Sequence, residues 1–365
     1  LREGMQFKGL VFSLDQRIQI LEFQEALGVD VCQAGYPSAF SGEAHVVRKV
    51  AEHARKKGFR IRTAALGRAI RFDTDILIQA GVDDLHFHFH VKPSVEPKEL
   101  PPLFRDLKDL VSHVRTQRPS ARISMAMLDL GRAEATLLNA CVAFLSQDLE
   151  VDIISLPDTS GIMTPDQVFS AIQDLVPKAS PSDLSVHCHN DMGMASANAF
   201  MGVLAGARVL EVSALGIGER NGMADLYTTA GQLKTRGQAM KLDIDNMDLF
   251  REYYRYVDAI VLEQTGESLF GYAFPGLGDG VKTHVAGTHA GQGFGRENEE
   301  KFHLNLLCGK GLVRQYLARE GLSRDLPPKI LEQITREIKN LSFNKGRRLK
   351  KDEVAAIVRQ GIREK

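Results

Sequence analysis

The chain has 365 residues, 44% of them hydrophobic and 25% charged, and 46 basic and 46 acidic side chains give a formal net charge of zero. This balance gives no electrostatic reason to expect nucleic acid or a membrane surface as a partner, and no apolar run approaches the roughly 18–20 residues of a membrane-spanning helix. No signal peptide opens the chain and the four cysteines form no C-x-x-C pair, so we expect a cytoplasmic protein without a disulfide framework.

Short segments rich in Val, Ile and Leu alternate with helical patterns along the first part of the chain. Strands of this kind are typical of a parallel sheet that is covered on both faces. The predicted strands are 29–35, 60–67, 83–90, 122–128, 151–157, 184–189 and 208–215. Helical patterns lie between them, for example at 14–28, 44–58 and 134–148, and several end in glycine, a usual C-cap residue.

This alternation predicts an α/β fold, and seven strands plus a strand stub at Leu1 fit a TIM (β/α)8 barrel over residues 1–236 whose first strand is truncated. Active-site residues of such barrels lie at the C-terminal ends of the strands. An open doubly wound sheet is the alternative. It is disfavoured because no Gly-rich phosphate fingerprint follows an early strand.

The pattern changes after residue 236. Residues 237–300 are interpreted as a linker and crossover subdomain, with a helical stretch at 240–270 and a Gly-rich stretch at 271–296. The Gly-rich stretch lacks the phosphate-binding pattern G-x-x-x-x-G-K-[ST]. Residues 301–365 read as amphipathic helices, so we expect a small, mostly helical C-terminal region after the barrel.

Two histidines point to metal chemistry. His187 and His189 are two residues apart at the end of a predicted strand, so both imidazoles lie on the same face. One carboxylate and two neutral imidazoles can hold a divalent cation and leave positions open for substrate. Asn190 or Asp191 would orient one of these imidazoles. Cys188 faces away from them and is interpreted as a packing residue.

Two further polar patches accompany the histidines. Arg2, Glu3 and Gln6 follow the expected first strand, and an arginine beside a metal would stabilise an oxyanion. His284 and His289 lie in the loop THVAGTHAG.

The chain resembles a known enzyme family. HCHNDMGMA followed by GIGERNGMADL is similar to the second signature of the alpha-isopropylmalate and homocitrate synthase family, and LREGMQF is similar to the end of its first signature, D-x-T-L-R-[DE]-G-x-Q. LPDTSGIMTP, GVDVCQAGYP and the H-x-x-G-x-H spacing also match. The resemblance covers nearly the whole chain. It implies a TIM barrel with helical subdomains, and a homodimer in which the C-terminal region crosses to the partner's site.

The resemblance also implies an activity, the condensation of an acyl-CoA, commonly acetyl-CoA as co-substrate, with a 2-oxo acid, as in amino-acid biosynthesis. Glu3, His187 and His189 would hold a divalent metal ion (Mg²⁺, Mn²⁺ or Zn²⁺), and Arg2 would be the catalytic arginine. The acid/base group would be His289, with His284. The residues expected to bind substrate are Gln6, Lys92, Arg132 and Thr159.

Several positions depart from the family pattern. Gln33 and Leu128 stand where relatives carry glutamate, and Met223 stands where isopropylmalate synthases carry asparagine, closer to homocitrate synthases. With the added Lys92, the pocket is expected to be more positive than in relatives. This favours a different, more anionic 2-oxo acid, whereas the alternative is drift in a degraded paralogue.

Other interpretations remain open. One is a retro-aldol lyase similar to HMG-CoA lyase, and another is a non-catalytic paralogue. His86, His88 and His90 share a strand face, which allows a second metal site or polar packing inside the barrel. The chain ends soon after the helical region, so we expect no leucine inhibition through a C-terminal effector domain.

Overall fold

The structure, a computed structural model, describes residues 1–90, 100–286, 300–323 and 325–363. The chain divides into two compact units, Leu1–Phe270 and Gly271–Lys365. The sequence-based boundaries at residues 236 and 300 are a different division and stay a prediction. None of the described helices is long and apolar enough to cross a membrane.

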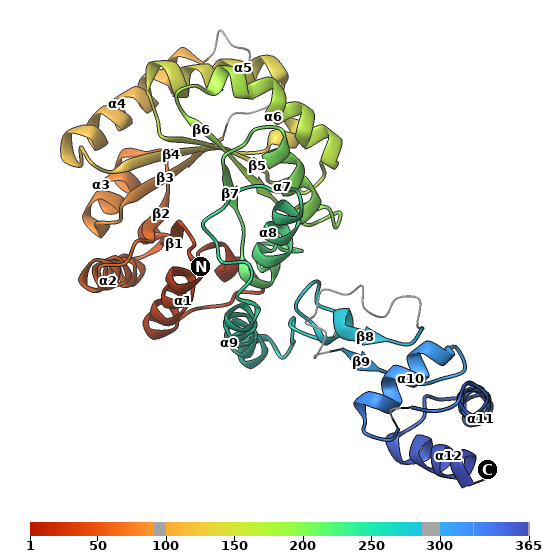
Figure 1. The fold of residues 1–365 in the computed structure, drawn as a ribbon. Helices are drawn as coiled ribbons and strands as arrows, with labels where there is room; N and C mark the ends of the chain where they lie inside the picture. The colour runs from red at the N-terminus through yellow and green to blue at the C-terminus, as the bar shows by residue number, and fades with distance from the viewer. Residues whose placement is uncertain (91–99, 287–299, 324, 364–365) are drawn as a thin grey trace. The chain divides into compact units, whose positions relative to one another are not determined.

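The first unit is built around a curled sheet of seven parallel strands in the order β1 to β7 (Figure 1). The strands are β1 (Val31–Gly35), β2 (Arg62–Arg68), β3 (Asp84–Phe89), β4 (Arg122–Met127), β5 (Ile153–Asp158), β6 (Asp183–Cys188) and β7 (Val209–Glu211). Each falls on a predicted segment, so the TIM-barrel-like prediction is confirmed. The edge strands of this described sheet are β1 and β7, and Arg2 N donates to Gln33 O at the end of β1 over 3.1 Å.

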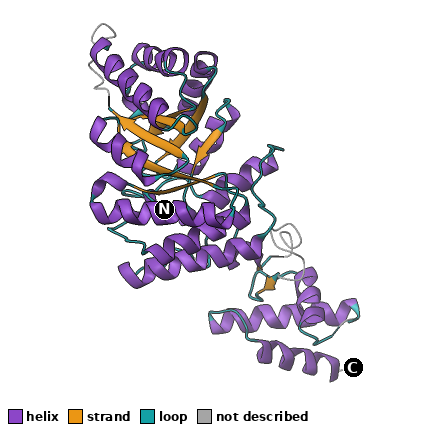
Figure 2. Cartoon of the chain, turned by 90° about the vertical axis from the view of Figure 1, so that its left-hand side faces the viewer, coloured by secondary structure: helices purple, strands orange, loops and turns teal. Residues whose placement is uncertain are grey.

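Helices cover the outer side of the sheet, where Figure 2 shows them in purple around the orange strands. They are α1 (Leu14–Leu27), α2 (Ser41–Lys57), α3 (Arg71–Ala80), α4 (Pro101–Gln117), α5 (Ala135–Ala143), α6 (Pro165–Ala179), α7 (Ala195–Leu204), α8 (Leu226–Thr235) and α9 (Met247–Thr265). A capping box of Ser13 and Gln16 starts α1, and Gly28 in the left-handed conformation ends it.

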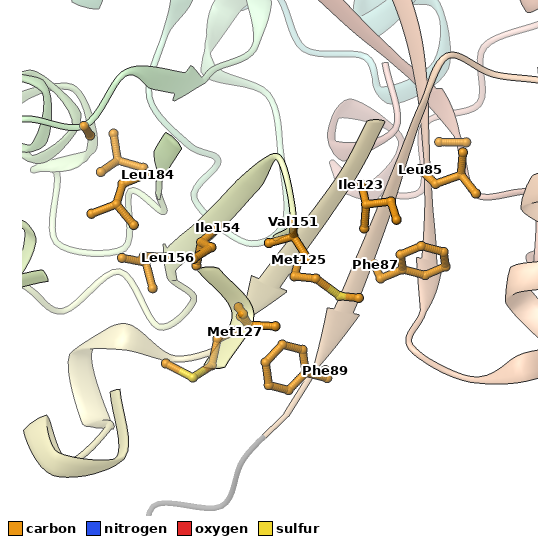
Figure 3. Packing of buried hydrophobic residues seen from close by; sticks show 14 of the residues in the cluster. Leu85, Phe87, Phe89, Ile123, Met125, Met127, Val151, Ile154, Leu156 and Leu184 are labelled. Carbon is orange, nitrogen blue, oxygen red and sulfur yellow. The ribbon is translucent and has the colours of Figure 1, made fainter. Parts of the chain in front are cut away.

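Strand alternation separates the packing face from the functional face. Leu85, Phe87 and Phe89 of β3 pack with alternate residues of β4 and β5 in the hydrophobic core (Figure 3). Cys188 of β6 is buried in the same core. The side chains that alternate with these along each strand, such as His86 and His187, face the inside of the curled sheet and line a cavity there.

Two predicted elements are shorter in the structure. β7 stops at Glu211, well before the predicted end at residue 215, because the chain turns at Ala214–Gly216, where Leu215 has a φ of +61°. The predicted helix 134–148 is α-helical only as far as Ala143. A wider π-helical turn, Phe144–Asp148, follows it and buries Ser146, whose hydroxyl donates to Ala179 O over 2.5 Å.

The second unit is mostly helical, as predicted. It contains β8 (Thr283–His284), β9 (Lys301–Phe302), α10 (Lys310–Arg319), α11 (Pro328–Lys345) and α12 (Lys351–Arg363). The helices share a small core of their own that includes Leu312, Ile334 and Val358. All four cysteines of the chain are buried and unpaired, three in the first unit and Cys308 in the second.

Candidate metal centre

Glu3, His187 and His189 come together although the sequence separates the first from the others by more than 180 residues. The atoms that could bind a metal all lie within 4.8 Å of one another, and the three residues are only 6–8% exposed. Glu3 begins the short 3-10 helix η1 (Glu3–Gln6), and the histidines lie at and just beyond the end of β6. The C-terminal ends of barrel strands are where catalytic groups are expected.

Hydrogen bonds orient both imidazoles in the same way. His187 Nδ1 lies 2.9 Å from Glu211 Oε2, and His189 Nδ1 lies 3.2 Å from Gly222 O. A carbonyl oxygen and a carboxylate only accept, so each histidine donates from Nδ1 and keeps a lone pair on Nε2. The two Nε2 atoms then face each other at 3.3 Å.

Two lone pairs so close repel unless a cation lies between them, which makes the donor set a suitable metal site. Nitrogens that share a tetrahedral ion at about 2.0–2.1 Å are separated by about 3.3–3.4 Å, the distance between the two Nε2 atoms here. The third donor, Glu3 Oε1, lies 4.0 Å from His189 Nε2. The residues therefore fit a divalent ion.

The electrostatics keep these groups in their ligand forms at neutral pH. Burial alone would raise the pKa of Glu3, but Arg2 and a hydrogen bond from Glu219 N–H lower it below its ordinary value. Burial lowers the pKa of His189 to about 4. Glu3 is thus ionised and His189 neutral, as metal ligands must be.

One turn contacts two of the three candidate ligands. In the turn 216–222, Glu219 N donates to Glu3 Oε1 over 3.2 Å, while Gly222 O accepts from His189. Gly222 has a φ of +86°, and a Cβ there would lie 2.0 Å from Gly216 O. Only glycine fits this position, which explains why the segment GIGERNG carries glycine at its end.

Arg2 lies beside the candidate ligands, as predicted. Its Nε donates to Gln33 Oε1 and its Nη1 to Gln6 Oε1, both over 2.8 Å, and Nη1 also pairs with Glu3. Gln33, one of the departures from the family pattern, therefore binds the arginine. These contacts hold the guanidinium at a cavity of about 580 Å³, which Glu3, His187 and His189 also line.

The other predicted residues divide into those at the cavity and those away from it. Gln6 and Thr159 line the cavity, and Thr159 Oγ1 accepts from Asp129 N over 2.9 Å. Arg132 is 57% exposed, pairs with Asp129 and does not line the cavity. His284 is buried in the second unit, 3.3 Å from Glu300. Lys92 and His289 lie outside the described residues.

The partners predicted from the sequence for the two candidate ligand histidines, Asn190 and Asp191, are wrong. Asp191 accepts instead from Arg220 over 2.7 and 2.8 Å, and Asn190 Oδ1 accepts from Ala195 N. The actual partners, Glu211 and Gly222, were missed. Glu211 lay within a predicted strand, but only the register that pairs it with His187 makes it a neighbour.

The histidines of β3 have partners of their own. His86 Nδ1 lies 3.3 Å from Ser124 Oγ, burial lowers the pKa of His86 to about 4, and His88 Nε2 lies 3.4 Å from the Tyr36 hydroxyl. In the described part of the chain, Glu3, His187 and His189 form the one group of three donors that could hold a metal. The second metal site considered for β3 thus has no support among these residues.

Comparisons with known proteins identify a family and related folds. The model of the HMGL-like family matches residues 1–252. A 2-isopropylmalate synthase from Sulfolobus acidocaldarius is 31% identical, over 79% of this chain and 72% of that protein. A homocitrate synthase from Pyrococcus abyssi is 28% identical, over 88% of this chain and 89% of that protein. Among solved structures, an HMG-CoA lyase from Bacillus subtilis superposes with a TM-score of 0.60 at 16% identity, covering 76% of this chain and 94% of the lyase.

Proposed function

The chain belongs to the HMGL-like family, and we propose that it is a metal-dependent acyltransferase that condenses an acyl-CoA, with acetyl-CoA as the expected donor, with a 2-oxo acid. The observation that carries the proposal is the convergence of Glu3, His187 and His189 beside Arg2 at one cavity. The names of the relatives, 2-isopropylmalate synthase and homocitrate synthase, support this reaction class.

Glu3, His187 and His189 would hold the divalent ion, which would act as a Lewis acid towards the oxygens of the 2-oxo acid. Both imidazoles are buried, and electrostatic interactions are stronger where less water surrounds them. Thr159, which lines the same cavity, would bind the substrate carboxylate.

Arg2 would stabilise the negative charge that develops during the reaction. After a base removes a proton from the methyl group of the thioester, the carbanion attacks the ketone carbon and negative charge develops on the ketone oxygen. The guanidinium, held by Gln33 and Gln6, is aligned before the reaction and stabilises that charge. Water then hydrolyses the thioester and releases CoA.

The proton-transfer group and the assembly remain parts of the proposal. His289, with His284, would remove and return the proton, offered across a homodimer by the C-terminal region. Gln6, which lines the cavity, is expected to contact substrate, and Lys92 and Arg132 are also expected to bind it.

The test is CoA release, measured with acetyl-CoA, a divalent metal and a panel of 2-oxo acids whose side chains range from apolar to anionic. We expect turnover with at least one of them and its loss in Glu3→Gln. Glu267→Gln is the matched control because Glu267 forms an exposed ion pair with Lys8. Absence of turnover with every acid, together with cleavage of a 3-hydroxy-3-methyl acyl-CoA, would instead favour a lyase.

A further inference from the structure

Glu211 is a partly buried acidic side chain to which the proposed reaction assigns no role. It ends β7 directly beside His187 of β6, its register partner in the parallel sheet. Its side chain is 21% exposed and borders the cavity that the candidate ligands line. An ionised group in such a position loses hydration free energy unless hydrogen bonds replace the lost water. The hydrogen-bond partners of Glu211 therefore indicate its role.

The two oxygens of Glu211 have different partners. Oε1 accepts from two hydroxyls, Ser155 Oγ over 2.5 Å and Ser185 Oγ over 2.8 Å, whereas Oε2 lies 2.9 Å from His187 Nδ1. The serines belong to β5 and β6, so three neighbouring strands meet at this carboxylate. With Oε1 occupied, the carboxylate cannot rotate away from His187 without losing two hydrogen bonds.

This arrangement decides which nitrogen of His187 carries the proton. An ionised carboxylate only accepts, so His187 donates from Nδ1 and keeps Nε2 free as a metal donor. His189 obtains the same tautomer from Gly222 O, a backbone group. The two ligand histidines therefore differ, because only the orientation of His187 depends on a side chain.

We propose that Glu211 is a positioning residue that fixes the tautomer and ring orientation of His187 and thereby sets the affinity of the site for its divalent ion. The inference rests on the metal site of the proposed function. Partners of this kind typically contribute roughly 10–100-fold to metal affinity. Ser155 and Ser185 hold the carboxylate in place, so their contribution reaches the metal only through Glu211.

The decisive variants are Glu211→Gln and Glu211→Ala. The glutamine keeps the size of the side chain but removes its charge, and its amide can present N–H to His187 and force the wrong tautomer. Ser185→Ala removes one hydrogen bond from Oε1 and leaves the contact between Oε2 and His187. Asp183→Asn is the control at the other end of β6, where Asp183 pairs with Arg208 near the surface.

Two measurements separate positioning from a merely structural role. Long-range ¹H–¹⁵N spectra of the metal-free, histidine-labelled protein report the tautomer of His187 directly. We expect the Nδ1–H form in the wild type and its loss in both Glu211 variants. Calorimetric titration with Mn²⁺ or Zn²⁺ should give an affinity lower by roughly 10-fold or more in both, a smaller loss in Ser185→Ala and no change in Asp183→Asn.

An unchanged His187 tautomer and an unchanged metal affinity in Glu211→Gln would overturn the positioning role while leaving the metal site intact. A wild-type protein that binds no divalent ion would overturn the metal site, and the inference with it. Urea unfolding of the metal-free variants distinguishes a positioning role from a loss of stability. If the loss of metal affinity is fully explained by a smaller fraction of folded protein, Glu211 only stabilises the fold. That result would contradict the proposal.

Discussion

The backbone N–H of Glu219 donates to Glu3 Oε1 over 3.2 Å, joining the start of the chain to a turn more than 200 residues later. The same turn supplies Gly222 O to His189. The positions of two candidate ligands that are far apart in the sequence therefore depend on one short backbone segment.

Replacing Gly222 should disturb both ligands at once. In Gly222→Ala the Cβ would meet Gly216 O at 2.0 Å, and the φ of +86° is unfavourable for alanine, so the turn has to move. We expect a loss of roughly 1–3 kcal/mol in the free energy of unfolding and a metal affinity lower by about 10-fold or more. Gly237→Ala is the control, since Gly237 also has positive φ but no atom lies within 4 Å of its Cβ. Equal metal affinities in the two variants would contradict the role of the turn.

Glu3→Gln tests the carboxylate ligand without the enzymatic reaction. The amide keeps the shape of the side chain but supplies no negative charge to the ion, and it weakens the pairing with Arg2. We expect metal per chain, measured by elemental analysis after purification with added Mn²⁺, to fall to background. Glu267→Gln should retain the wild-type content. Full metal occupancy in Glu3→Gln would show that the ion binds elsewhere.

Asp73 gives a prediction about pH and stability. This buried carboxylate accepts from the backbone N, Nε and Nη2 of Arg68. Burial would raise its pKa, yet the contacts with Arg68 hold the pKa below its usual value. A lowered folded-state pKa contributes stability above the unfolded pKa of about 3.9, and that contribution is lost as the pH falls through the folded value.

Accordingly, Asp73→Asn should be less stable than the wild type by about 1–3 kcal/mol between pH 5 and 7, and the difference should shrink below pH 4. Urea unfolding across this range measures it. Asp75→Asn on the same helix, whose exposed carboxylate pairs with His113 and Arg71, should have a smaller effect. If the difference in unfolding free energy between the wild type and Asp73→Asn increased as the pH fell, the prediction would be wrong.

The outer side of β3 should carry much of the stability. Phe87 is fully buried in the hydrophobic core, so Phe87→Ala is expected to cost about 3–5 kcal/mol in unfolding free energy (Figure 3). Phe72, which is 64% exposed on α3, provides the control, and Phe72→Ala should change stability by no more than about 0.5 kcal/mol. Similar losses in both variants would mean that the packing face of the strand is misassigned.

Much of the fold could be predicted because each strand combines apolar composition with a following helix pattern. The ends of the strands and helices were harder to predict. β7 has an apolar continuation after Glu211, but the left-handed Leu215 ends the pairing there, and no residue type marks that conformation. The π-helical turn after α5 has the same apolar pattern as a regular helix, so periodicity did not reveal it.

In the candidate site, too, some residues could be predicted from the sequence and others could not. His187 and His189 were predicted to converge because spacing along a strand decides the face of a side chain. Glu211 was missed because its contact depends on the register between two strands, which one sequence does not reveal. Gly222 was missed for another reason: it acts through its carbonyl oxygen, a group that every residue carries.

The burial of all four cysteines has a practical consequence. Burial raises the pKa of the Cys188 thiol well above its ordinary value and that of Cys141 to about 11, so neither offers a thiolate at neutral pH. A cysteine introduced at an exposed position would be the most reactive thiol of the native protein. Fluorescent or spin labels can therefore be attached at chosen positions without first replacing the native cysteines, which opens a direct route to distance measurements in solution.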